Sequence, residues 1–232
     1  MNPEIYGMNV AFTVSMKGLF IILSGIVFCF GITSCAVSNN PLRKEVKLLQ
    51  KRMIKDDTSY VYVLPFENKK RHLLVQGYFG VWSHKERAAL DFKMKRGTPI
   101  LAARNGVVIR VKEDGSKGGW GKKYRSQGNN IVIQHSDNSR SGYWHLKKDG
   151  ALVNVGDTVK QGQVIGFSGK TGYAAMPHLH FIVWKNTGGN WQQIATRFQT
   201  SKGIRYLKPW KWYRNKRKGT ITTSQNVETA GQ

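Results

Sequence analysis

The sequence predicts an all-β fold, a single-domain β-sandwich or barrel with short helices at most. Short runs of β-branched and aromatic residues recur between residues 60 and 184, and Gly, Asn and Asp separate them at the spacing of strands and turns. No long stretch in this part has the 3.6-residue hydrophobic period of a helix. The predicted domain, residues 57–212, is long enough to bury a real core.

A glycine-rich run at residues 153–172 supports the sandwich. Its glycines permit the tight turns between short strands, as in biotinyl and lipoyl carrier domains, and this favours a sandwich built from a duplicated hybrid motif. A carrier module is therefore the rival at the level of the fold. It would need a modifiable lysine in an exposed hairpin, and Lys170 does not lie in that family's motif.

The N-terminal part is typical of an export signal. Residues 18–34 are apolar or small and uncharged, Lys17 precedes them, and Cys35 follows. We assign residues 1–34 to a signal peptide, with Met16 as an alternative start. Residues 32–35, Ile-Thr-Ser-Cys, resemble the lipobox of bacterial lipoproteins, in which the cysteine is lipidated and becomes the mature N-terminus. The alternative is an uncleaved membrane anchor, and both place the rest outside the cytoplasm.

The flanks of the domain predict a tether and a tail. Residues 35–56 are polar and basic, and we interpret them as a lipidated tether with a short helix over residues 43–53. Residues 213–232 have little to bury and predict a basic, disordered tail. Ala36 is not the Asp that retains lipoproteins in the inner membrane, so a lipid anchor in the outer membrane, facing the periplasm, is expected in a cell with two membranes.

Charge limits the classes of binding partner, and cysteine content limits the types of metal ligand. The formal net charge of +24 first suggests nucleic acid, but an exported protein meets other polyanions, namely anionic lipid and carboxylate-bearing peptidoglycan peptides, so no nucleic-acid partner is expected. A basic segment with interleaved aromatic residues, 208–218, suits an anionic lipid surface or is a solvated tail. The only cysteines are Cys29 and Cys35, so any metal in the domain must be held by His and carboxylates.

Three short segments carry the candidate chemistry. In the predicted strand around His178-Leu179-His180, alternation places both histidines on one face and Leu179 on the core face. Asp91 lies between Leu90 and Phe92 in an apolar strand, where an unpaired carboxylate is costly, so it needs a metal or a cation.

The other histidines complete this set. His84 lies seven residues before Asp91, and alternation along Tyr143-Trp144-His145 puts Tyr143 and His145 on one face. Tyr143 is a candidate for substrate contact.

The order of these segments is similar to that of the lysostaphin/LytM-type peptidoglycan metallopeptidases, over about residues 64–184. In that family an HxxxD motif and the second histidine of HxH hold zinc. This implies one Zn²⁺ bound by His84, Asp91 and His180. The spacing departs from the common form, because Arg87 stands four residues before Asp91. The resemblance also implies that His145 and His178 are the catalytic pair.

The chemistry of these residues agrees with that assignment. Two imidazoles and a carboxylate leave a fourth zinc position open for a water. No HExxH motif supplies a glutamate base, so His145 and His178 must handle protons, with the base and oxyanion roles open between them. The expected function is a zinc-dependent endopeptidase that cuts peptidoglycan cross-links, with the D-alanyl-diaminopimelate bond favoured. The alternative is a non-catalytic activator of cell-wall amidases.

Overall fold

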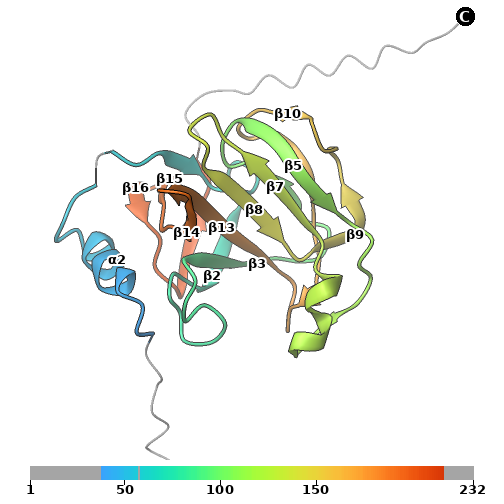
Figure 1. Ribbon diagram of the computed structural model, residues 1–232, viewed down its shortest axis with the longest axis horizontal. Coiled ribbons are helices and arrows are strands. Elements are labelled where there is room, and N and C mark those ends of the chain that lie inside the picture. Colours follow the sequence, from blue (N-terminus) through green and yellow to red (C-terminus); the bar gives the residue numbers. More distant parts are fainter. Residues whose placement is uncertain (1–37, 57, 217–232) are drawn as a thin grey trace, which may run out of the picture. The chain divides into compact units, whose positions relative to one another are not determined.

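The computed structural model describes residues 38–56 and 58–216, and their fold is all-β, as predicted (Figure 1). The helices in these residues are α2 (Leu42–Lys51) and the 3-10 helix η1 (Lys122–Gln127). The strands are β1 (Val61–Val63), β2 (Arg71–Gln76), β3 (Ala89–Lys93), β4 (Pro99–Leu101), β5 (Gly106–Lys112), β6 (Gly118–Gly119), β7 (Asn130–Gln134), β8 (Arg140–Trp144), β9 (Leu146–Ala151), β10 (Thr158–Val159), β11 (Val164–Ser168), β12 (Gly172–Tyr173), β13 (His178–Thr187), β14 (Asn190–Gln193), β15 (Arg197–Thr200), β16 (Gly203–Tyr206) and β17 (Lys211–Arg214). The predicted signal peptide and Cys35 lie outside the described residues.

A nine-stranded sheet organises the domain. Its strand order is β10-β5-β7-β8-β13-β3-β2-β17, and β14 pairs additionally with β13. Figure 1 shows β5, β7 and β8 side by side; both pairs are antiparallel, and β5 and β7 pair with one register shift between Val108 and Arg110. The long strand β13 pairs antiparallel with β8 on one side and with β3 on the other. Side chains from three neighbouring strands therefore meet on one face of the sheet around β13.

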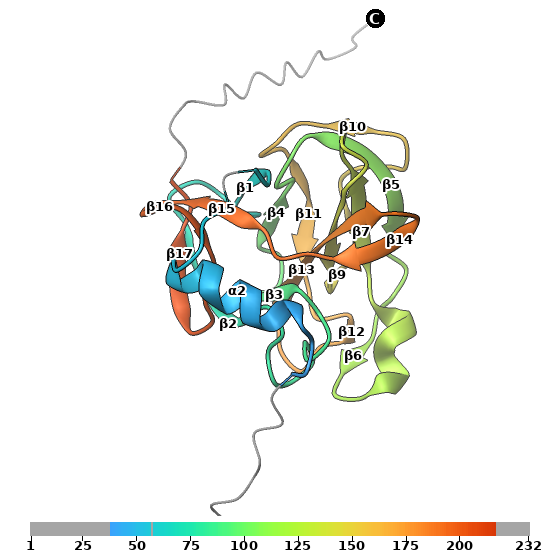
Figure 2. The same ribbon diagram turned by 60° about the vertical axis from the view of Figure 1, so that its left-hand side comes forward.

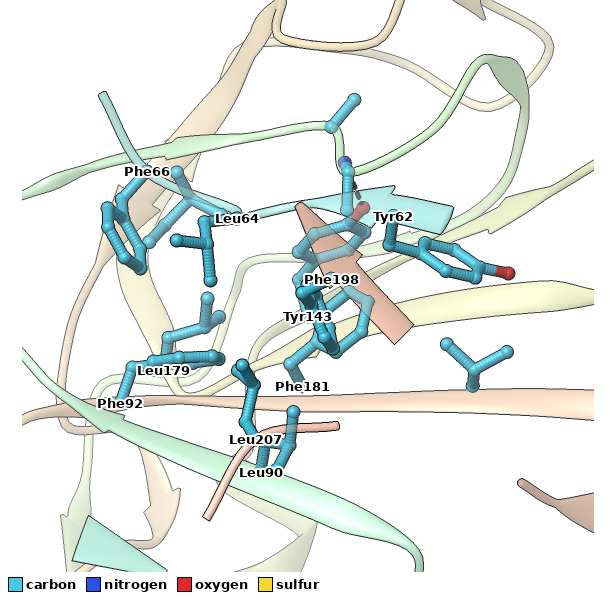
Figure 3. Close-up of a cluster of buried hydrophobic side chains, with 14 of the residues drawn as sticks. Tyr62, Leu64, Phe66, Leu90, Phe92, Tyr143, Leu179, Phe181, Phe198 and Leu207 are labelled. Atoms are coloured by element: carbon cyan, nitrogen blue, oxygen red, sulfur yellow. Dashed lines mark hydrogen bonds between the residues drawn. The ribbon is translucent and has the colours of Figure 1, made fainter. Parts of the chain in front are cut away.

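The core lies on the opposite face of β13. Leu179, Phe181 and Val183 alternate along the strand and are almost fully buried, as predicted. Figure 3 shows Phe181 beside Tyr143 and Phe198, and the ring centroids are 5.3 and 5.7 Å from that of Phe181. Burial of each such side chain stabilises the fold by about 1.5–3 kcal/mol. The core thus fixes the position of β13 and of the polar face that it presents.

Helix α2 packs on the domain, so residues 38–56 are not a free tether. The sequence predicted the helix but treated its segment as a linker. Val46 is buried, and Leu49 packs against the core from the same side of the helix. Gln50 Nε2 donates a hydrogen bond of 2.6 Å to the carbonyl of Leu207. The apolar stripe of α2, which is short within a basic sequence, is enough to attach it.

The domain also extends beyond the predicted boundary at residue 212. Strand β17 pairs antiparallel with β2 and includes Tyr213, which is buried. Asn215 is 1% exposed, and its Nδ2 donates to the carbonyl of Phe66. Backbone pairing, which composition does not reveal, holds this basic segment in place. Residues 217–232 of the predicted tail lie outside the described part of the chain.

Neither helix in residues 38–56 and 58–216 has both the length and the apolar character needed to cross a membrane.

Candidate active site

Three buried side chains bring potential metal ligands together. Asp91 Oδ1 lies 2.9 Å from His180 Nδ1 and 3.2 Å from His84 Nε2. The two imidazole nitrogens are themselves 3.2 Å apart. The predicted ligand residues therefore form one cluster that can hold a metal ion.

The sheet register explains how two of these residues meet. His180 of β13 lies directly opposite Asp91 of β3. Leu90 and Phe92 turn the other way into the core, so the carboxylate faces the same side as the imidazole. Because the two residues are paired across neighbouring strands, their spacing is set by backbone hydrogen bonds.

His84 reaches the cluster from the loop between β2 and β3. Its Nδ1 lies 3.2 Å from the carbonyl of Gly77. A carbonyl only accepts, so Nδ1 carries a proton and donates, and Nε2 faces Asp91 Oδ1 and His180 Nδ1. The N–H of Arg87 bonds the carbonyl of His84 at 2.9 Å, which closes a turn within the loop. This turn places His84, three residues before the usual motif position, at the cluster.

The donor set suits a divalent metal. Burial lowers the pKa of His180 to about 4, although Asp91 beside it acts in the opposite direction, so the imidazole is neutral at pH 7. Burial alone would raise the pKa of Asp91, but the neighbouring His84 and His178 hold it well below its usual value. One carboxylate and two neutral imidazoles are typical zinc ligands, and atoms about 2 Å from a tetrahedral ion lie roughly 3.3 Å from one another. The observed separations match this.

His145 and His178 stand beside the cluster. Their ring centroids are 4.5 Å apart, and His178 Nε2 lies 3.7 Å from Asp91 Oδ1. His178 Nδ1 donates to the carbonyl of Met176 at 2.8 Å, and His145 Nδ1 donates to that of Thr171 at 2.7 Å. Both rings are thus held through Nδ1, and Nε2 is the nitrogen that can exchange a proton with a substrate. Burial, with repulsion from His178 and His180, lowers the pKa of His145 well below its usual value.

The expectation for Tyr143 is wrong. This side chain is fully buried against Phe181, and its hydroxyl accepts a hydrogen bond of 2.8 Å from the N–H of Ala103. The alternation argument fails because β8 ends at Trp144 and His145 has a left-handed φ of 65°. Such a conformation in a non-glycine residue costs about 1–3 kcal/mol and is often found at functional sites. It turns His145 toward the cluster of candidate metal ligands, while Tyr143 stays in the core.

A cleft of about 690 Å³ opens over these groups. His145, His178, His180 and Asp91 line it. Its walls are rich in aromatic side chains, namely Trp82, Trp120, Trp144, Tyr173 and Trp184. The candidate catalytic groups therefore face a space large enough for a peptide.

Two further residues of the site, one that orients Asp91 and one that lines the cleft, were not predicted from the sequence. Gln76 is 4% exposed, and its Nε2 lies 3.4 Å from Asp91 Oδ2 and 2.8 Å from Ser83 Oγ, so it orients the carboxylate. Its position at the buried end of an apolar strand is the signal that could have revealed it. Trp144 lines the cleft in the place expected for Tyr143.

Gly142 makes room for Trp144. A Cβ atom at residue 142 would lie 1.9 Å from Cζ3 of Trp144 and 2.9 Å from Cζ3 of Trp184. The indole of Trp144 thus leans back over the strand, where only a glycine leaves space for it.

Comparison with known proteins agrees with this site. The model of peptidase family M23 matches residues 85–193, which contain four of the five clustered residues; His84 precedes the match by one position. Residues 85–193 form a peptidase family M23 domain. The M23 match spans the loop before β3 through β14 and so includes β3, β8 and β13, whereas His84 and Gln76 precede it.

Relatives of this chain include a peptidoglycan endopeptidase and a lipoprotein by name. The peptidoglycan DD-endopeptidase ShyA of Vibrio cholerae serotype O1 is 38% identical over 39% of the chain and 18% of its own length. The uncharacterized lipoprotein YgeR of Escherichia coli is 38% identical over 52% of the chain and 39% of its own length. The crystallised catalytic domain of lysostaphin from Staphylococcus simulans is 32% identical, with 54% of this chain and 88% of that chain covered and a TM-score of 0.39. The chain spans less than two-fifths of these curated relatives.

Proposed function

We propose that this protein is a zinc-dependent endopeptidase that hydrolyses stem-peptide cross-links of peptidoglycan. The observation that carries the proposal is the cluster of His84, Asp91 and His180 with His145 and His178 beside it, in an open cleft. The M23 domain and the DD-endopeptidase among the relatives support it.

The roles of the residues follow from their positions. His84, Asp91 and His180 would hold the zinc, which when bound supplies an activated water and polarises a carbonyl. His145 presents an unprotonated Nε2 to the cleft, so it can accept the proton that the attacking water loses. His178, on the same face as His180, is placed to donate to the developing oxyanion or to the leaving amine. Gln76 keeps the Asp91 carboxylate in position.

The substrate is the finer part of the proposal. Purified cross-linked muropeptide dimers joined by a D-alanyl-diaminopimelate bond should be converted to monomers, and a zinc chelator should block this. A pentaglycine peptide should remain intact. Mass spectrometry of the products measures both the conversion of dimers and the integrity of pentaglycine. Cleavage of pentaglycine alone would replace the proposed substrate by a glycyl bridge.

A non-catalytic activator of cell-wall amidases is the second candidate. It predicts that neither peptide is cleaved and that the purified protein contains no zinc. The cluster of three candidate ligands, with Asp91, His180 and both nonligand histidines lining one cleft, favours the enzyme.

We further propose that the protein is lipid-anchored through Cys35 in the outer membrane, facing the periplasm, and that its basic surface contacts anionic lipid. The YgeR relative carries the word lipoprotein in its name. A second groove has a volume of about 570 Å³. Within the described part of the chain its lining includes eight Lys and Arg side chains and no carboxylate: Lys51, Arg52, Arg71, Lys202, Arg205, Lys208, Lys211 and Arg214. Trp212, at its edge, is 59% exposed. Cations beside an exposed indole suit a lipid headgroup surface.

Both parts of this localisation can be tested. Metabolic labelling with a palmitate analogue should mark the protein, and Cys35→Ser should abolish the label. In the Cys35→Ser background, changing Lys208, Lys211 and Arg214 to Gln should lower binding to vesicles that contain phosphatidylglycerol. Loss of label with unchanged vesicle binding would retain the anchor and exclude the lipid contact. A labelled Cys35→Ser protein would exclude the anchor.

A further inference from the structure

The cleft over the candidate metal ligands has more basic than acidic side chains in its lining. Apart from the histidines, its charged lining residues are Asp91, Arg87 and Arg125. The carboxylate of Asp91 already contacts the imidazoles of His84 and His180. In the described part of the chain, no carboxylate lies within 4.0 Å of a nitrogen of either arginine, and the surface ion pairs involve other residues. Two arginines without a carboxylate partner in that part of the chain thus line the space where a substrate would lie.

These arginines come from opposite sides of the site. Arg87 lies in the loop before β3, three residues after His84. Arg125 belongs to η1, which leads into β7. Because β13 stands between β3 and the β7-β8 pair in the sheet, the two segments flank the strand that carries His178 and His180. Figures 1 and 2 both show this loop and the yellow-green η1 at the same end of the large sheet.

The neighbours of Arg125 favour a bound anion. Its guanidinium carbon lies 5.9 Å from the ring centroid of Tyr173, another residue of the cleft wall. A guanidinium presents paired N–H donors that match the two oxygens of a carboxylate, and an adjacent aromatic ring limits the orientations that the side chain takes. The remaining walls are largely aromatic and apolar and would cover the uncharged part of a peptide.

We propose that Arg125 and Arg87 are specificity-determining residues that bind free carboxylates of the substrate on either side of the scissile bond. This rests on the proposed peptidase function and narrows it to anionic peptides. Cross-linked stem peptides carry free carboxylates beside the bond, whereas a glycyl bridge carries none. The cleft should therefore reject stem peptides whose carboxylates are amidated.

The test compares two muropeptide dimers that differ only in whether these carboxylates are free or amidated. For the full-length wild type in detergent, kcat/KM should be about 10- to 100-fold higher with free carboxylates, the range expected for loss of a charged hydrogen bond. Arg125→Gln should lower kcat/KM for the free form by the same factor, mainly through KM, and leave the amidated form unchanged. Arg87→Gln should act in the same direction. Arg125→Lys should recover part of the loss, because it keeps the charge without the paired donors.

Controls separate this inference from the proposed function. Lys122→Gln removes a charge from an exposed position of the same helix outside the cleft lining, and it should change neither substrate's kinetics. Equal metal content and melting temperature should show that Arg125→Gln is folded. Equal losses on both dimers, or wild-type indifference to amidation, would overturn the inference. If neither dimer is cleaved, the proposed function fails, and calorimetric binding of free and amidated stem peptides still decides the role of Arg125.

Discussion

Asp91→Asn is expected to remove both the metal and the activity. Asp91 Oδ1 lies within 3.7 Å of nitrogens from His84, His178 and His180, and among residues 38–56 and 58–216 no other carboxylate lines the cleft. An amide keeps the shape but supplies no negative charge, and its NH₂ group can face the imidazoles. Loss of an outer partner of a metal ligand already costs about 10- to 100-fold in affinity, and loss of a ligand costs more. After dialysis, elemental analysis should find about one zinc per wild-type chain and less than a tenth of that in the variant.

Asp137 provides the matched control for that change. It pairs with Arg104 at 2.9 Å, away from the cleft, so Asp137→Asn should keep its zinc and its activity. Equal zinc in the wild type and in Asp91→Asn would refute the assignment of Asp91 as a ligand.

His145→Ala is expected to lower kcat by about 10²- to 10⁴-fold, the usual contribution of a general base, with the zinc content unchanged. His145 Nδ1 is held by the carbonyl of Thr171, so only Nε2 can take the proton. Loss of a group that acts in the transition state should reduce kcat and kcat/KM in parallel. Steady-state kinetics on muropeptide dimers, with metal analysis of the same sample, measures both quantities.

A buried histidine outside the cleft tests whether this loss is specific. His135 is 2% exposed, and its ring nitrogens contact the carbonyl of Asn105 and Ser141 Oγ. His135→Gln should retain turnover. If His145→Ala keeps more than a tenth of the wild-type kcat, His178 would have to be the base.

The sequence was informative wherever the side-chain period of two held. Along β13, the core face of Leu179 and Phe181 and the polar face of His178 and His180 follow directly from alternation. Asp91 could be placed by the same rule, since a carboxylate between two core residues must face the other way. Local pattern was thus enough to select most of the residues of the candidate site.

The sequence was misleading or silent where backbone conformation, or contact between distant segments, determines which side chains reach the site. The left-handed φ of His145 breaks the alternation that was assumed for Tyr143, and nothing in a histidine's identity requires that conformation. Gln76 meets Asp91 only because β2 and β3 pair with a register shift. Arg125 enters the cleft from η1, 34 residues along the chain from Asp91. Such encounters depend on pairing and loop paths that no local pattern encodes.

The space that Gly142 leaves for Trp144 also restricts the routes by which this cleft can evolve. A Cβ atom at residue 142 would overlap the indole of Trp144 at 1.9 Å, so a larger residue there requires this indole to move. Replacement of Trp144 by a small residue removes the closest overlap, and Trp184 Cζ3, at 2.9 Å, then sets the limit at position 142. Substitutions at the glycine and at the two tryptophans are therefore coupled: a change of the glycine reshapes the cleft wall, and loss of Trp144 makes that change easier to accommodate.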